Sequence, residues 1–302
     1  MGRRRSSDNN NIHGILLLDK RVGISSNGAL QEVKRLFGAG KAGHTGSLDP
    51  LASGLLPICM GKATKISSFL LDTDKQYRVS IRLGIKTTTG DAEGEVIEKN
   101  SLETLCLADI KSVLLRFVGR VSQIPPMYSA LKQDGVRLYE LARKGINVKR
   151  QPRDVFIHKL EYRHYGDGLL DLDVGCSKGT YIRSLAEDIG DALGCGAHVE
   201  TLIRTRVGGF DVSEAWSIAE LRTKKETGDA LCCLLPTENA VLSWPALTLA
   251  EDMVYYLKQG QPVRTPNAPS KGRVRLRNAQ NVFFGVGEML EDGRVAPRRL
   301  LH

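Results

Sequence analysis

The sequence has few cysteines, and their spacing does not suit the common cysteine-based sites. None of the six lies in a C-x-x-C pair or in a Cys/His arrangement that would bind zinc. We therefore expect reduced, mostly structural thiols and no bound metal. A phosphate-binding P-loop and a dinucleotide-binding glycine motif are also missing. Chemistry that uses a metal, a nucleotide or a redox group is thus not indicated, and we expect no cofactor.

Long apolar runs are absent as well. The leucine stretch Ile15–Leu18 is too short even for the core of a signal peptide, and nothing approaches the length of a membrane span. The N-terminal residues Met1–Ser6 fit the loose pattern for N-myristoylation, which short sequences often meet by chance. We expect a cytoplasmic protein that does not attach to membranes.

Acidic residues are outnumbered by basic ones. The 43 lysines and arginines exceed the 34 acidic residues, which gives a formal net charge of +9. Such an excess favours a polyanionic partner, although a membrane surface or simple solubility would also account for it. The basic residues concentrate between residues 132 and 153, at Lys132, Arg137, Arg143, Lys144, Lys149, Arg150 and Arg153.

Apolar periodicity predicts a chain of mixed strands and helices. Strands are indicated over residues 14–19, 77–83 and 170–174, and short strand-like runs occupy 274–276 and 282–286. Helices are indicated from Ser25 to Gly38, over 66–71, over 107–117 and over 182–193. At 302 residues, the chain is long enough for one large domain and a smaller one.

The segment Gly43–Gly54 is rich in residues that break regular structure. It contains three glycines and Pro50, so we expect a tight loop, not a helix or a central strand. Proline disfavours the helical conformation for the residue before it, which is Asp49. The loop therefore presents the Asp49 carboxylate, although an ordinary Asp-Pro turn would have the same local sequence.

Four stretches resemble the motifs of the TruB family of pseudouridine synthases. They are the run Lys41–Lys65, the Lys-x-Tyr-Arg sequence at 75–78, Lys-Gly-Thr-Tyr-Ile-Arg at 178–183, and Leu-x-Arg-Thr-x-x-Gly from Leu202. The resemblance implies that the chain isomerises the T-loop uridine (position 55) of transfer RNA to pseudouridine. It also implies an α+β fold: a pseudouridine synthase fold with a mixed, largely antiparallel central sheet and a small C-terminal β-rich PUA-like domain.

The resemblance implies a role for each of seven residues. Asp49 is expected to act as nucleophile or base, and Arg183 to orient its carboxylate. Tyr77 is expected to stack on the target base and could assist proton removal at C5. His44 would fill the space that the flipped base leaves, and Leu202 would pack beneath that base. Tyr181 and Lys65 complete the expected substrate-binding set. Attack at C1′, addition at C6 and proton abstraction at C2′ all stay open.

The implied domains are a disordered basic arm over residues 1–12, a catalytic domain over 13–244 and a PUA-like domain over 245–302. A thumb-like insertion at about 124–153 is expected to close over the RNA. The resemblance implies the T-arm of transfer RNA as the partner, and we expect a monomer. Two departures from the family pattern are Arg21, where proline is usual, and Thr88, where aspartate is common. An RNA-binding or RNA-folding module without turnover, or a nucleoside hydrolase, would be the alternatives.

Overall fold

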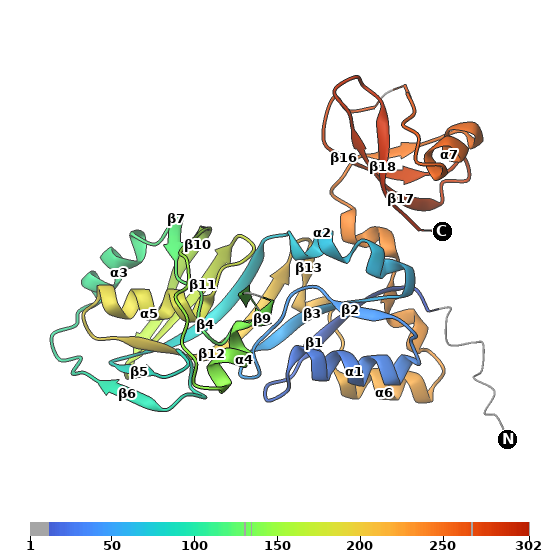
Figure 1. Cartoon of the computed structure of the whole chain (residues 1–302). Helices are drawn as coiled ribbons and strands as arrows, with labels where there is room; N and C mark the ends of the chain where they lie inside the picture. The colour runs from blue at the N-terminus through green and yellow to red at the C-terminus, as the bar shows by residue number, and fades with distance from the viewer. Residues whose placement is uncertain (1–11, 130, 134, 267, 302) are drawn as a thin grey trace.

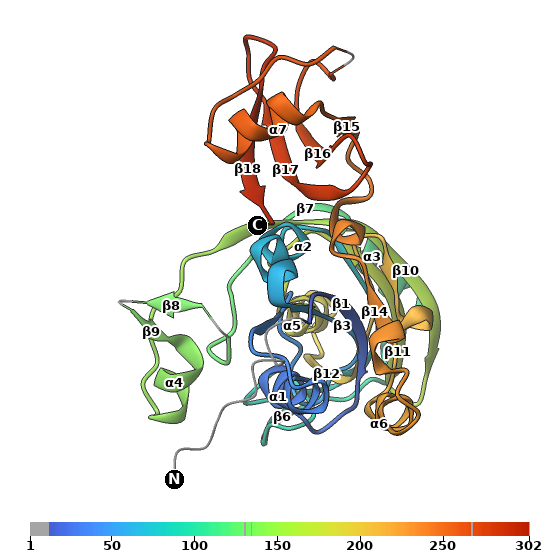
Figure 2. The same ribbon diagram turned by 90° about the vertical axis from the view of Figure 1, so that its right-hand side faces the viewer.

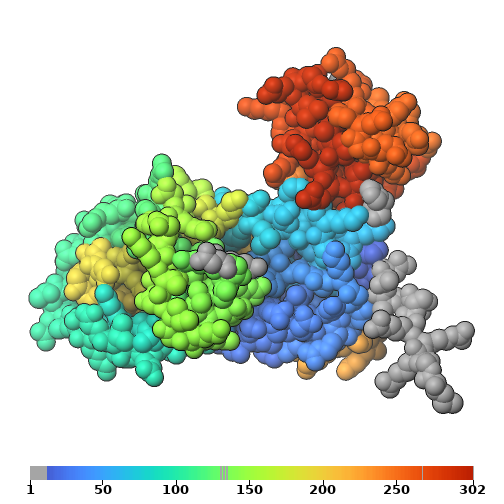
Figure 3. Space-filling view, viewed as in Figure 1, coloured from blue at the N-terminus to red at the C-terminus, as the bar shows by residue number. Residues whose placement is uncertain are grey.

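The computed structural model describes residues 12–129, 131–133, 135–266 and 268–301. Apart from Ile12, the basic arm expected over residues 1–12 lies outside these ranges. The chain forms a large sheet covered by helices and a small second sheet, which stands as a separate lobe at the C-terminal end (Figures 1 and 3). No helix in the described part of the chain is long and apolar enough to cross a membrane.

The large sheet is mixed and mostly antiparallel, as predicted, because β12 and β3 are the only two of its strands that pair in parallel within the described residues. In spatial order its strands are β14 (Leu234–Leu235), β1 (Gly14–Lys20), β3 (Ser53–Met60), β12 (Ala197–Val207), β4 (Lys75–Leu83), β11 (Leu169–Cys176), β10 (Arg153–Gly166) and β7 (Gly119–Gln123), with β2 (Ala42–His44) beside β3 and β13 (Phe210–Asp211) beside β12. The predicted strands over 14–19, 77–83 and 170–174 are confirmed as β1, β4 and β11.

Helices lie around this sheet. Four of them occupy positions that the apolar spacing predicts: α1 (Ser26–Phe37), α2 (Ser67–Leu71), α3 (Leu107–Leu115) and α5 (Ile182–Ala192). Helix α6 (Ile218–Glu226) and the 3-10 turns η2 (Gly61–Lys65), η3 (Val212–Glu214), η4 (Ala230–Cys233) and η5 (Thr237–Val241) were not predicted. Helix α1 begins where the Ser25 side chain accepts from the Gly28 N–H and ends at Gly38, whose φ of 65° is left-handed.

Both faces of the sheet are covered around β1, which explains why Ile15–Leu18 form a continuous apolar run. Leu16 and Leu18 pack in the core that includes α1 and α5. Ile15 and Leu17 pack on the opposite face with Ala63 and Leu70, which come from η2 and α2. A strand that is buried on both faces needs no polar alternation.

The expected loop over Gly43–Gly54 is shorter than predicted at both ends. Gly43 and His44 belong to the edge strand β2, and Ser53 and Gly54 open the central strand β3. The remaining residues, 45–52, connect the two strands and carry Asp49. Ser26 fastens this loop to α1, because its hydroxyl donates to the Leu48 carbonyl (2.9 Å) and accepts from the Leu48 N–H (2.7 Å).

Two small hairpins project from the main sheet. Strands β5 (Ile85–Thr87) and β6 (Val96–Lys99) form one of them. The other, β8 (Lys132–Gln133) and β9 (Val136–Arg137), precedes helix α4 (Leu138–Arg143) within residues 124–153. Figure 2 shows β8, β9 and α4 standing to one side of the large sheet, and we call residues 124–153 the thumb-like segment.

The C-terminal sheet contains β15 (Ala246–Thr248), β16 (Arg273–Arg277), β17 (Phe283–Met289) and β18 (Val295–Leu300), with helix α7 (Glu251–Lys258) beside it. The predicted strands over 274–276 and 282–286 are thus confirmed as β16 and, from Phe283, β17. One contact between this sheet and the rest of the chain is made by the Arg273 guanidinium, which lies over the rings of Phe69 and Trp244.

Candidate active site

Asp49 forms an ion pair with Arg183. Asp49 Oδ2 lies 3.0 Å from Arg183 Nε, and the two residues are 134 positions apart in the sequence. The Asp49 side chain is 38% exposed, whereas that of Arg183 is 5% exposed. The carboxylate is therefore held from the protein side and open to solvent on the other, where a substrate can approach it.

Arg183 is held by three further groups. Its Nη1 donates to the Thr89 carbonyl (3.1 Å) and its Nη2 to the Tyr128 carbonyl (2.7 Å). Asp91, which is also buried, places Oδ2 3.6 Å from Arg183 Nη1. The planar guanidinium thus connects the Asp49 loop, the turn before β6 and the thumb-like segment. Such a fork fixes orientation as well as charge.

The electrostatics of Asp49 reflect both burial and its charged neighbours. Partial burial raises the pKa of the Asp49 carboxyl above its ordinary value, although the Arg183 charge opposes this. Asp91 raises the pKa further, and Lys20 lowers it. The carboxylate is consequently a stronger base than a free aspartate, with cations beside it that favour its ionised form.

Lys20 lies beneath the Asp49 loop and is only 1% exposed. Its ammonium donates to the carbonyls of Ile24 (2.8 Å), Arg21 (3.0 Å) and Pro50 (3.4 Å). Burial lowers the pKa of Lys20 to about 8. Lys20 therefore connects the end of β1 to the residue after Asp49. Arg21, which stands where the family usually has proline, pairs with Glu32 of α1.

Tyr77 lies on β4 beside a second buried arginine, Arg204. The Arg204 side chain interacts with the Tyr77 hydroxyl, and burial raises the pKa of Tyr77 despite that cation. Arg204 also donates to three main-chain carbonyls, those of Leu55 (2.8 Å), Gly46 (3.1 Å) and Ser47 (3.3 Å). It fixes the loop that carries Asp49 against β12, and it is 1% exposed.

His44 and Leu202 lie on strands that flank this region. His44 ends β2, and its Nδ1 is buried with no hydrogen-bond partner among the residues described here. Burial lowers the pKa of His44, and the Arg204 charge adds to that effect, so the ring is neutral near pH 7. Leu202 is buried on β12 opposite Val79 of β4 and packs in the main core.

Tyr181 and Lys65 occupy different parts of the molecule. Tyr181 directly precedes α5, so it stands two residues from Arg183. Lys65 ends η2, and its ammonium donates to the Leu300 carbonyl of the C-terminal sheet (3.0 Å). The eight residues of β3 separate η2 from the Asp49 loop. At about 3.3 Å per residue, Lys65 and Asp49 lie at opposite ends of a strand roughly 25 Å long.

Four polar residues of this region were not predicted as site residues: Lys20, Asp91, Gln123 and Arg204. Three of them offered a signal. Lys20 is the last residue of the apolar strand β1, and Arg204 is the arginine of the Leu-x-Arg-Thr-x-x-Gly motif. Asp91 belongs to the turn that contains Thr88, whose hydroxyl accepts from the Glu95 N–H (3.1 Å) and so keeps a hydrogen bond in that turn.

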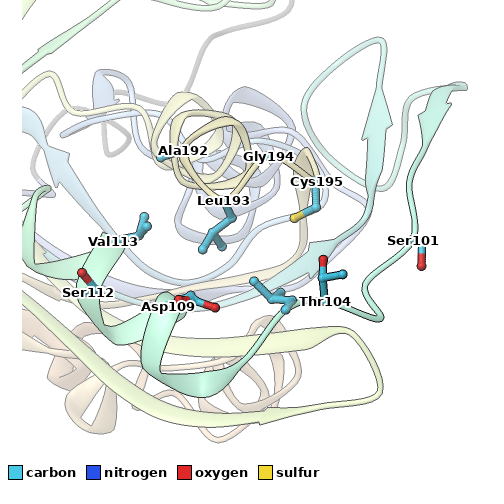
Figure 4. Close-up of a pocket in the computed structure, with 10 residues that line it drawn as sticks. Ser101, Thr104, Asp109, Ser112, Val113, Ala192, Leu193, Gly194 and Cys195 are labelled. Atoms are coloured by element: carbon cyan, nitrogen blue, oxygen red, sulfur yellow. The ribbon is translucent and has the colours of Figure 1, made fainter.

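A separate cavity of about 410 Å³ lies between α3 and the turn after α5 (Figure 4). It includes none of the predicted site residues, and its charged lining residue, Asp109, accepts from the Cys106 N–H at the start of α3. Within the described ranges, no three His, Cys, Asp or Glu side chains gather as a metal site would require. The candidate active site is therefore the cluster that Asp49 forms with Arg183, Asp91 and Lys20.

Comparison with known proteins places this cluster in context. Residues 34–182 match the profile described as "TruB family pseudouridylate synthase (N terminal domain)". Residues 183–242 match "tRNA pseudouridylate synthase B C-terminal domain", and residues 245–301 match "Pseudouridine synthase II TruB, C-terminal". The three matches follow one another along nearly all of the described chain.

Similar proteins extend over the same length. The chain is 56% identical to tRNA pseudouridine synthase B of Nitrosococcus oceani over 303 aligned positions, which cover 100% of this chain and 98% of that protein. It is 51% identical to tRNA pseudouridine synthase B of Pseudomonas fluorescens, with 96% of each chain covered. A solved structure of a Cbf5-Nop10-Gar1 complex contains a chain that matches with a TM-score of 0.75 at 26% identity, covering 96% of this chain and 85% of that one. The chain belongs to the TruB family of pseudouridylate synthases.

Proposed function

We propose that this protein isomerises the T-loop uridine of transfer RNA to pseudouridine, with Asp49 as the reacting carboxylate. The observation that carries the proposal is the Asp49–Arg183 pair, in which a buried arginine holds a solvent-accessible carboxylate at 3.0 Å. The named relatives that are 51% and 56% identical over almost the whole chain support the same activity.

The reaction needs no external group. The N1–C1′ bond breaks, the uracil turns, and a C5–C1′ bond forms, while the proton on C5 leaves and N1 ends with a proton. Asp49 can serve as a nucleophile toward the sugar or the base, or as the base that removes a proton. Attack at C1′, addition at C6 and abstraction at C2′ all begin with the ionised carboxylate, which Arg183 and Lys20 favour.

The neighbouring side chains are proposed to hold the target base. The reacting uridine must leave its stack to reach Asp49, because the target atoms are not accessible inside folded RNA. Tyr77 offers an aromatic ring for stacking, and Leu202 an apolar surface beneath the base. His44 is proposed to fill the vacated place in the RNA. Tyr181 is proposed to contact the substrate from the start of α5.

The proposed RNA surface extends beyond the reacting base. In the thumb-like segment, the guanidinium groups of Arg137 and Arg143 lie over the ring of Tyr139, at 5.9 and 5.5 Å from the ring centre. These cations suit contact with phosphates of the T-arm. Lys65, at the junction with the C-terminal sheet, is proposed to contact the RNA away from the reacting loop. We further propose a PUA-like C-terminal domain over residues 245–302, a monomer, and action in the cytoplasm.

An RNA-folding module without turnover is the alternative that the basic surface also supports. The two functions are separated by release of tritium from a transfer RNA transcript labelled at C5 of uridine, with purified protein and no added cofactor. We expect tritium release by the wild type and none by Asp49→Asn. Asp72→Asn, an exposed aspartate paired with Lys178, is the matched control and should behave as the wild type.

The position of the modification is tested with a second transcript in which cytidine replaces the T-loop uridine. We expect no release from that transcript and an intact RNA chain throughout. Binding of the first transcript without release by the wild type would instead support the RNA-folding module. Release from the cytidine transcript would overturn the T-loop assignment, and free uracil would indicate a hydrolase.

A further inference from the structure

The start of helix α5 is hydrogen-bonded to the root of the thumb-like segment. Arg183 Nη2 donates to the Tyr128 carbonyl at 2.7 Å, and the Ser184 hydroxyl donates to the Ile124 carbonyl at 3.0 Å. Ser184 is buried, whereas Ile124 is exposed. Two adjacent residues of the helix that supplies the partner of Asp49 are therefore bound to a segment 55 to 60 positions earlier in the chain.

Gln123 makes a third contact with the start of α5, and this contact consists of two hydrogen bonds. Its side-chain Oε1 accepts from the Tyr181 N–H at 3.1 Å, and its Nε2 donates to the Tyr181 carbonyl at 3.3 Å. The amide thus pairs with both main-chain groups of one residue, as a neighbouring strand would. Gln123 is 1% exposed, so water does not replace it.

The paired residue matters because Tyr181 stands immediately before the first turn of α5. Its backbone is extended, with φ −101° and ψ 111°, and its side chain forms no cap for the helix. The amide of Gln123 therefore fixes the direction in which the helix begins. Arg183 is the second residue of that helix, and a rotation at Tyr181 moves the guanidinium relative to Asp49.

We propose that Gln123 is a positioning residue for the Asp49–Arg183 pair, which links the root of the thumb-like segment to the geometry of the reacting carboxylate. Gln123 ends β7 and is followed directly by Ile124, so it lies where the thumb-like segment leaves the sheet. The inference rests on the proposed function, because its effect is on the rate of that reaction. It assigns Gln123 no contact with the RNA.

The test is the single-turnover rate of tritium release, measured over a series of protein concentrations in excess over the labelled transcript. The series gives the rate at saturation and the half-saturating protein concentration separately. Gln123→Met keeps the length of the side chain and removes both hydrogen bonds. A misplacement of the reacting group by about 1 Å can cost roughly 100-fold, so we expect the saturated rate to fall about 10- to 100-fold.

Two further variants keep the result interpretable. Ser184→Ala removes the neighbouring link, the hydrogen bond from the Ser184 hydroxyl to the Ile124 carbonyl, and takes away a single oxygen atom from the side chain. One hydrogen bond of about 1 kcal/mol corresponds to a fall in rate of roughly fivefold. The matched control is Asn100→Leu, which removes an amide donor to the Cys195 carbonyl (2.8 Å) just beyond the other end of α5. Its saturated rate should stay within about twofold of the wild type.

The proposal requires that the saturated rate falls in Gln123→Met and Ser184→Ala while the half-saturating concentration stays within about threefold. A rise in the half-saturating concentration with an unchanged saturated rate would overturn it and make Gln123 part of RNA docking. An equal loss of rate in Asn100→Leu would overturn it in favour of general stability. The wild type is measured in the same series, so failure of the proposed function appears there as absent release.

Discussion

Replacing Arg183 by lysine keeps the positive charge and removes the planar fork, so the substitution separates charge from orientation. The guanidinium reaches Asp49 Oδ2 through Nε, the Thr89 carbonyl through Nη1 and the Tyr128 carbonyl through Nη2, at 3.0, 3.1 and 2.7 Å. A lysine ammonium is a single compact donor group on a flexible stem, and it cannot meet three partners that lie around a plane. We expect it to keep one of the three.

The size of the effect follows from the two hydrogen bonds that are lost. A hydrogen bond to a charged group contributes about 2 kcal/mol, so two amount to about 4 kcal/mol. Each 1.36 kcal/mol in the activation free energy is tenfold in rate, and a loss of this size at the transition state slows the reaction about 1000-fold. A lysine at position 183 keeps the positive charge that lowers the pKa of Asp49, so the loss of rate reports the orientation of the carboxylate.

The assay is the single-turnover rate of tritium release with saturating protein, beside a thermal unfolding curve of each variant. Arg163→Lys is the matched control, because Arg163 is half-exposed and makes one ion pair with Asp173 at 2.7 Å. A pair of that kind contributes roughly 1 kcal/mol or less, so the control should keep its rate. A folded Arg183→Lys protein that reacts within tenfold of the wild type would refute the reasoning.

Two other predictions concern ionisation and the C-terminal sheet. Partial burial raises the pKa of Asp49 above the ordinary 3.8, and burial lowers that of Lys20 to about 8. The single-turnover rate should therefore fall on the acid side as Asp49 gains a proton and on the alkaline side near pH 8 as Lys20 loses its charge. Lys20→Arg should move only the alkaline limb, to higher pH, and an unmoved limb would contradict this. Glu238 accepts from Arg275 Nη1 (2.8 Å) and from Arg277 Nε (2.9 Å) and Nη2 (2.9 Å), so Glu238→Gln should lower the free energy of unfolding by about 1–3 kcal/mol. Urea denaturation measures this change, and equal stability of the two proteins would count against the contact.

The regular elements could be predicted because their signals are local. The strand β4 alternates buried and more exposed residues, and α1 has its cap residues Ser25 and Gly38 at its ends. The small β-rich tail was also predictable from short apolar runs between turns. Side chains return to the same face every two residues in a strand and about every 3.6 residues in a helix. The order of apolar residues within a short stretch therefore indicates which element forms there.

The ends of the Asp49 loop could not be predicted, because a glycine can be required either by a loop or by the close approach of two strands. We attributed Gly54 to a loop, but it lies within β3, where φ is 95°. A Cβ at this position would lie 2.4 Å from the Arg204 carbonyl oxygen. Glycine is required there for the close approach of β3 to β12, which is a tertiary cause that no local pattern reports.

The supporting residues of the site were missed for a related reason. Lys20, Asp91 and Arg204 come from three separate segments, and spacing along the chain carries no information on contacts between them. The motifs identified Asp49 and Arg183, which the structure brings together. The supporting role of Lys20 and Arg204 becomes clear only when burial is known, because a charge that is 1% exposed needs partners that a surface charge does not.

Asp49, the reacting carboxylate, belongs to a group of charged residues. The other members described by the structure are the cations Lys20, Arg183 and Arg204 and the carboxylates of Asp91 and Glu93. Arg183 lowers the pKa of Asp49, whereas burial and Asp91 raise it. A carboxylate held by Arg183 alone would be ionised but weakly basic. Asp91 shares the same guanidinium and therefore weakens the hold of Arg183 on Asp49. Because the strength of a base rises with its pKa, burial and Asp91 make the Asp49 carboxylate a stronger base, while Arg183 and Lys20 favour its ionised form.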